Sequence, residues 1–163
     1  MFLKEFEIRW NDLDANRHLA NISYLSYASD TRMAFLTLLG ISHKKLTEWA
    51  IGPVVFNEQL FYFKEVLPDQ RIRVSFELKG MSEDGKFFQF EHNYYDPEGN
   101  NLARCEMMGG WMDLKNRKLC ALPSAVLTLF KNAAPSDSYT LLQPDDTRKA
   151  SRIPISLDQK LNP

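Results

Sequence analysis

The sequence predicts an α+β fold in which a curved antiparallel sheet wraps around one long helix. An apolar segment with helical spacing covers residues 22–39, and alternating segments separated by turn residues follow between residues 54 and 113. One helix and a meander of roughly four or five strands bury both of their apolar surfaces only when the sheet curls around the helix. The length of 163 residues and the hydrophobic content of 44% suit one globular unit.

The first half of the chain predicts one strand and two helices. Residues 2–10 alternate between apolar and charged side chains, which is typical of a half-buried strand. Residues 22–39 are mostly apolar, so we expect a largely buried helix that Asn21 caps at its start and Gly40 ends in a left-handed conformation. Residues 42–50 add a short second helix. The polar positions of the long helix are Ser23, Ser26, Asp30 and Thr37.

The second half predicts the meander and a last helix. Residues 54–66 are rich in Val and Phe, and residues 71–79 alternate regularly, so one sheet face meets the core and the other meets water. Turn residues then separate two more strands over residues 86–95 and 102–113. A short helix covers residues 124–131. The inward side chains of the regular strand are Ile72, Val74, Phe76 and Leu78.

We expect one domain over residues 1–131 and a polar tail over residues 132–163 that is mobile or draped on the surface.

Composition and charge narrow the classes of function. Twenty basic and twenty-one acidic residues give a formal net charge of -1, which argues against general binding of nucleic acid or anionic membrane. Without a membrane span or an apolar N-terminal leader, we expect a cytoplasmic protein. The two cysteines and three histidines have no metal-ligand spacing, so we predict no metal site.

Residues 12–21, Asp-Leu-Asp-Ala-Asn-Arg-His-Leu-Ala-Asn, concentrate chemically capable side chains directly ahead of the long helix. A helix start accounts for one Asn or Asp as a cap, and a turn accounts for one more. Neither explains the whole set. The candidate catalytic residues are Asp14, Asn16, His18 and Asn21.

This segment and the Tyr24 that follows it resemble the motif Asp-x-Asn-x-His-x-Asn-Asn-x-x-Tyr of hotdog-fold thioesterases. The similar proteins are the acyl-carrier-protein thioesterases and the acyl-CoA thioesterases of the 4-hydroxybenzoyl-CoA type. The resemblance extends in element order over residues 3–131. It implies the hotdog fold and a homodimer or homotetramer. It also implies hydrolysis of an acyl thioester, with coenzyme A as the preferred carrier and acyl carrier protein as the second choice. It implies no cofactor beyond the carrier of the substrate.

The resemblance also implies roles for individual residues. The carboxylate of Asp14 would attack the thioester carbonyl or activate water, as an ionised carboxylate can. Asn16 and His18 would orient the substrate, the water or Asp14. At Asn21 the unpaired N–H groups of the helix start would hold the carbonyl oxygen, with the positive end of the helix dipole behind them. Arg17 and Tyr24 are the candidate substrate-binding residues.

Three departures from the family motif bear on the site. Arg17 stands where relatives often have Gly, so either the loop needs no positive φ angle there or its path differs. Ala20 and Asn21 replace a pair of Asn residues, which removes one amide. Asp30 stands where many relatives carry Glu.

Other interpretations remain open. Asp12 and Asp14 could be turn formers, Asn21 a helix cap and His18 a loop histidine. The protein could bind acyl thioesters or another apolar ligand without turnover. An enoyl-thioester hydratase of the same fold would need its histidine one residue later than His18. A pure interaction module would depend on residues 132–163.

Overall fold

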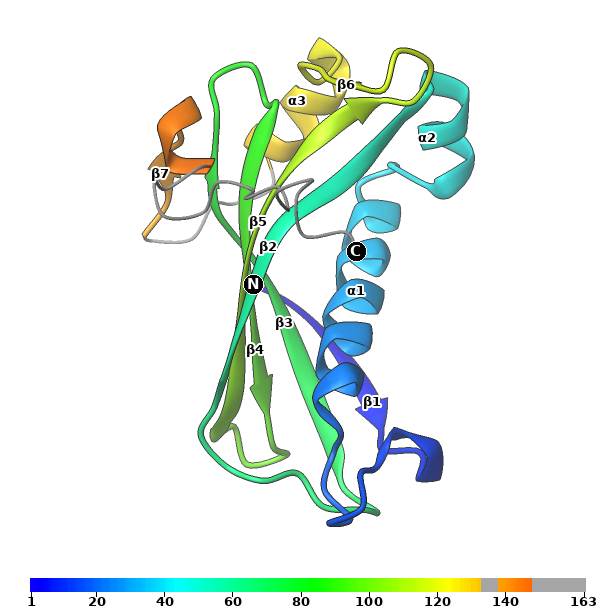
Figure 1. The fold of residues 1–163 in the computed structure, drawn as a ribbon, viewed down its shortest axis with the longest axis vertical. Helices are drawn as coiled ribbons and strands as arrows, with labels where there is room; N and C mark the ends of the chain where they lie inside the picture. The colour runs from blue at the N-terminus through cyan, green and yellow to red at the C-terminus, as the bar shows by residue number, and fades with distance from the viewer. Residues whose placement is uncertain (133–137, 148–163) are drawn as a thin grey trace, which may run out of the picture.

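The computed structural model describes residues 1–132 and 138–147. Its sheet has the strand order β1-β3-β4-β5-β2, and the neighbours along this path are antiparallel. The helix α1 lies along one side of this sheet (Figure 1). The elements are β1 (Phe2–Glu7), η1 (Trp10–Asp12), α1 (Asn21–Leu38), α2 (His43–Trp49), β2 (Ile51–Tyr62), β3 (Arg71–Met81), β4 (Phe87–Tyr95), β5 (Asn101–Asp113), β6 (Lys118–Leu119), α3 (Ser124–Asn132), β7 (Thr140–Leu141) and η2 (Pro144–Thr147). The predicted α+β arrangement is confirmed.

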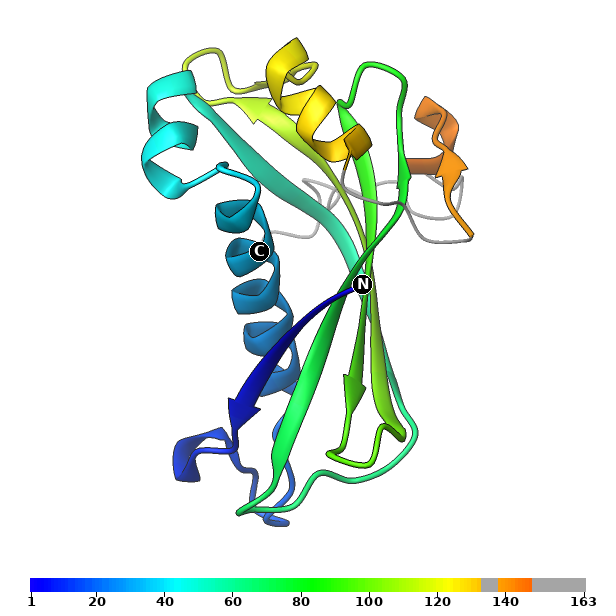
Figure 2. The same cartoon turned by 180° about the vertical axis from the view of Figure 1, so that it is seen from behind.

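Two apolar clusters fill the space between α1 and the sheet. The upper cluster lies toward α2 and α3 and includes Phe76, Phe90 and Trp111. The lower cluster lies toward the start of α1 and includes Tyr24 and Tyr94. Figure 2 shows α2 and α3 at one end of the sheet and the loop before α1 at the opposite end. The four predicted inward side chains of β3, Ile72, Val74, Phe76 and Leu78, are all buried.

The start and the burial of α1 differ from the prediction. Ala20, in extended conformation, is the N-cap, and Asn21 is instead the first helical residue. The predicted cap is therefore wrong. Ser23 is buried rather than exposed, because its hydroxyl donates to the backbone oxygen of Asp12 at 2.9 Å. The helix is also less buried than expected, since the sheet covers one side only: Ile22 is 71% exposed and Leu38 is 70% exposed.

Several strand limits also differ. β1 ends at Glu7 instead of residue 10, because the chain turns into η1, where the Arg9 amide and side chain both donate to Asp12. β2 starts at Ile51, ahead of the predicted residue 54, and contains Pro53 opposite Trp111 of β5. A proline is tolerated there because β2 is an edge strand, where a missing N–H costs no sheet hydrogen bond.

The segment 138–147 adds a short strand to the sheet. β7 pairs in parallel with the end of β3, with Gly80 opposite Thr140. A Cβ atom on Gly80 would lie 2.9 Å from the backbone oxygen of Thr140, so the close approach requires glycine. The rest of the predicted tail, residues 133–137 and 148–163, lies outside the described residues. Within the described part of the chain, none of the helices has the length and apolar character needed to cross a membrane.

Candidate functional site

Asp12 fixes the motif loop to α1. Its side chain is buried and accepts hydrogen bonds from the Arg9 guanidinium at 2.9 and 3.0 Å and from the Tyr27 hydroxyl at 2.6 Å. The hydrogen bonds from Arg9 hold the pKa of Asp12 below its ordinary value, against the opposing effect of burial. The Asp12 backbone oxygen accepts from Ala20 N at 2.8 Å. Asp12 is therefore a structural anchor of the site.

Asp14 closes the loop with one of its two carboxylate oxygens. Its Oδ1 accepts from the backbone N–H of Asn16 at 2.8 Å and of His18 at 3.1 Å. The backbone of Asp14 donates to His18 O at 2.8 Å, and Leu13 pairs with Leu19 as a β-bridge at the base of the loop. Among the described residues no side chain or N–H donates to Oδ2. One oxygen of Asp14 is thus held by the loop, and the other is free to act on a substrate or a water.

Arg17 adopts the left-handed conformation with φ 63°. The loop therefore keeps a positive φ at the position where relatives often have glycine, and the alternative of a loop without it is wrong. A non-glycine residue pays roughly 1–2 kcal/mol for this conformation. The strain is confined to one residue of a loop that Asp14 and Asp12 hold in place.

His18 contacts a residue that sequence reasoning missed. Its Nε2 lies 2.9 Å from Oε2 of Glu65, in the segment that follows β2. The two segments are joined by a backbone hydrogen bond from Leu19 N to Val66 O at 2.8 Å. Nothing in the local pattern around Glu65 indicates this contact, because it depends on how the end of β2 folds back against the motif loop.

A cleft of about 390 Å³ opens between the motif loop, the first turn of α1 and the end of β2. We call it the α1 cleft. Burial raises the pKa of Tyr24 to about 12, so its hydroxyl stays protonated. The helix begins here, and the N–H groups of Asn21 and Ile22 have no partner within the helix. The residues that line the cleft are Asp14, His18, Leu19, Asn21, Tyr24, Tyr62, Phe63, Lys64 and Glu65.

The structure brings together most of the predicted site. Asp14, His18, Asn21 and Tyr24 all line the α1 cleft. Asn16 and Arg17 belong to the same loop but do not line the cleft, and the described contact of Asn16 is the backbone bond to Asp14. A carboxylate, an imidazole and unpaired helix N–H groups around one cleft can activate water and stabilise a developing oxyanion.

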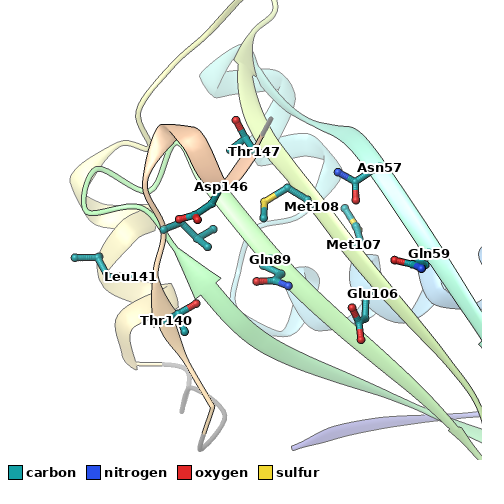
Figure 3. A pocket seen from close by; sticks show the side chains of 11 residues that line it. Asn57, Gln59, Gln89, Glu106, Met107, Met108, Thr140, Leu141, Asp146 and Thr147 are labelled. Carbon is teal, nitrogen blue, oxygen red and sulfur yellow. The ribbon is translucent and has the colours of Figure 1, made fainter. Parts of the chain in front are cut away.

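A second pocket, of about 460 Å³, lies where β7 and η2 lean against β2, β4 and β5 (Figure 3). Its strand side carries amides and a carboxylate, among them Gln59, Gln89 and Glu106, and its other side carries Thr140 and Asp146. Within the described residues, no group of histidines, cysteines and carboxylates could hold a metal ion. The α1 cleft is the better candidate for catalysis, because it combines a carboxylate, a histidine and the start of a helix, whereas the second pocket is lined by neither a histidine nor a helix start.

Comparison with known proteins identifies relatives of the chain. A family model for the thioesterase-like superfamily matches residues 8–130. A comparison with curated proteins found no match. The matched residues include the motif loop and α1, and they end before β7 and η2.

Solved structures show the same fold at low sequence identity. A hypothetical protein from Staphylococcus aureus in complex with CoA has a TM-score of 0.75 and 18% identity, covering 96% of this chain and 95% of that one. A 1,4-dihydroxy-2-naphthoyl-CoA thioesterase from Synechocystis has a TM-score of 0.72 and 16% identity, covering 80% of this chain and 96% of that one. These likenesses confirm the predicted hotdog fold.

Proposed function

The chain belongs to the thioesterase-like superfamily, and on this premise we propose that it hydrolyses an acyl thioester of coenzyme A to a carboxylic acid and a free thiol. The observation that carries the proposal is the α1 cleft. It places Asp14, with one carboxylate oxygen free of loop hydrogen bonds, beside the open N-terminus of α1. A thioester of acyl carrier protein is the second choice of substrate. The reaction needs no cofactor beyond the carrier of the substrate.

The proposed mechanism uses the free oxygen of Asp14 and the start of α1. Asp14 takes a proton from water, whose oxygen attacks the carbonyl carbon. Alternatively, the Asp14 carboxylate attacks that carbon itself and forms a mixed anhydride, which water hydrolyses after the thiolate has left. The carbonyl oxygen, which gains negative charge, accepts hydrogen bonds from the N–H groups at Asn21 and Ile22. One such donor is typically worth about 100- to 1,000-fold in rate. The carbon–sulfur bond then breaks, and the thiolate leaves and takes up a proton.

The other motif residues position these groups. His18 is held by Glu65 and faces the cleft, where its imidazole would orient the water or the substrate. Asn16 acts through its backbone N–H, which fixes the Asp14 carboxylate. Tyr24, with its hydroxyl protonated, would donate to a polar atom of the substrate near the thioester.

The direct test is thiol release from a panel of acyl-CoA and aryl-CoA thioesters by the full chain. Hydrolysis of at least one member supports the proposal. Thioester binding without thiol release would contradict it and favour a non-catalytic ligand-binding protein of the same fold. The 1,4-dihydroxy-2-naphthoyl-CoA thioesterase among the structural neighbours justifies the aryl members of the panel.

Arg17 allows binding and loop geometry to be tested together. We expect Arg17→Gly to raise the free energy of unfolding by up to about 1 kcal/mol, because glycine adopts positive φ without strain. If the guanidinium binds the phosphates of CoA, the KM for the thioester should rise several-fold with kcat unchanged. The variant Arg117→Gly is the matched control. Arg117 also has a positive φ, of 56°, but lies in the turn between β5 and β6. An unchanged KM in Arg17→Gly would remove Arg17 from the binding site.

We also propose that two copies of the chain form a homodimer, or a tetramer built from such dimers. β2 is one of the two end strands of the sheet path and exposes Val55 and Phe56, while α1 exposes Ile22 and Leu38. An open strand edge with apolar side chains favours pairing with another chain. We expect light scattering to give at least twice the monomer mass of 18.9 kDa, and Val55→Lys to reduce it. A monomeric native chain would contradict this proposal.

A further inference from the structure

A belt of polar side chains crosses the inner face of the fold between the two apolar clusters. We define it as Thr31 and Arg32 of α1, Glu58 of β2 and His92 of β4. Arg32 Nη1 donates to Glu58 Oε1 at 3.2 Å, and the two side chains are 13% and 22% exposed. Burial, aided by the charge of Arg32, lowers the pKa of His92 to about 3, so this imidazole is neutral. The belt therefore contains one charged pair, Arg32 and Glu58.

The charged pair lies on the same two elements that form the α1 cleft, farther from the motif loop. Leu25 and Arg32 are seven residues apart and share one face of α1. Leu60 and Glu58 are two residues apart and share one face of β2. Leu25 and Leu60 are only partly buried where they pack against the lower cluster. Along α1 and β2, this apolar pair thus lies between the cleft residues Tyr24 and Tyr62 and the charged pair.

The distance from the cleft to the charged pair corresponds to an acyl chain of medium length. Tyr24 and Arg32 are separated by about 12 Å along α1, and Tyr62 and Glu58 by about 13 Å along β2. Carbon–carbon bonds of about 1.52 Å opened at about 111° advance roughly 1.25 Å each, so about ten carbons span this distance. A longer chain would have to lie against the charged pair and remove its remaining water. Such desolvation is strongly unfavourable.

We propose that Arg32 and Glu58 set the length limit of the acyl group, so that the site accepts short and medium chains of up to about ten carbons and rejects longer ones. This inference rests on the proposed function of the α1 cleft. It assigns to the pair a role in specificity, separate from the chemistry at Asp14.

Binding of S-alkyl-CoA thioethers from butyl to hexadecyl tests the inference without turnover. For the native protein we expect the affinity to rise about fourfold per methylene as far as decyl and then to stay level or fall. In the double variant Arg32→Met with Glu58→Leu, the affinity should continue to rise, with hexadecyl gaining at least about tenfold relative to decyl. The matched control is Lys45→Met with Glu48→Leu, which removes an ion pair on α2 and should keep the native profile.

The outcomes separate this inference from the proposed function. A native protein whose affinity keeps rising to hexadecyl would overturn the length limit. A folded double variant with an unchanged affinity profile would also overturn it, because that result is expected if the belt only fixes α1 against the sheet. If the double variant does not fold, Arg32→Gln with Glu58→Gln replaces it: two amides can still hydrogen-bond to each other but carry no charge, so thioethers longer than decyl should gain affinity, and an unchanged profile would overturn the inference. A length limit without thiol release would support the role of Arg32 and Glu58 while contradicting hydrolysis. No binding of any thioether would contradict both.

Discussion

Replacing Asp14 with Asn should lower kcat for thioester hydrolysis by at least about 100-fold, because it removes the only motif carboxylate that lines the α1 cleft. The fold should survive. An Asn side chain keeps an oxygen that can accept from Asn16 N and His18 N, the two bonds that Asp14 Oδ1 makes in the loop. We expect the free energy of unfolding to stay within about 0.5 kcal/mol of the native value. Thiol release and urea unfolding measure the two effects separately.

Two further variants sharpen this test. Asp14→Ala also removes the loop hydrogen bonds, so activity should fall as in Asp14→Asn while stability falls by about 1–2 kcal/mol more. Asp145→Asn makes the same chemical change in η2, outside the α1 cleft, and should leave both quantities unchanged. An Asp14→Asn variant with near-native kcat would show that Asp14 only forms the turn, which is the simpler interpretation of its two bonds to the loop backbone.

The fold could be predicted where each residue's environment follows from its neighbours in sequence. The inward side chains of β3 alternate regularly, and all four are buried. The prediction failed where a distant segment decides. Ser23 is one of the polar positions of the helical pattern, but it is buried, because the backbone oxygen of Asp12 accepts a hydrogen bond from its hydroxyl. β7 has two residues and no period of its own, and it exists because the end of β3 offers a free edge.

The site shows the same division between local and tertiary information. Asp14, His18, Asn21 and Tyr24 lie close together in sequence and could be found from the motif. Glu65 could not, because its contact with His18 needs the end of β2 to return to the loop. The charged pair Arg32 and Glu58 joins residues 26 positions apart on a helix and a strand, and neither residue stands out in its own segment.

Asp12→Ala should be the most destabilising of these changes, lowering the free energy of unfolding at neutral pH by about 3 kcal/mol. The carboxylate is buried, and its loss leaves the Tyr27 hydroxyl without its acceptor at 2.6 Å. The Arg9 side chain is 63% exposed, so Arg9→Met should cost clearly less than Asp12→Ala. Tyr27→Phe should fall between the two, at roughly 1–2 kcal/mol. Urea unfolding of the three variants gives this order, and a larger loss from Arg9→Met than from Asp12→Ala would contradict it.

The pH dependence of these variants tests the same assignment, because the pKa of Asp12 is held below its ordinary 3.8 by the Arg9 and Tyr27 hydrogen bonds. A carboxyl group with a lowered pKa in the folded state contributes stability that is fully present above its unfolded pKa and is lost as the pH falls through the folded value. The native protein should therefore have a larger free energy of unfolding than Asp12→Ala down to about pH 4. Below that pH, the two free energies of unfolding should converge. If the difference in unfolding free energy stayed constant through that range, the carboxylate charge would not be what anchors the motif loop to α1. The difference would then come from packing and uncharged hydrogen bonds of the Asp12 side chain, because the Asp12 backbone oxygen that accepts from Ala20 and Ser23 is present in both proteins.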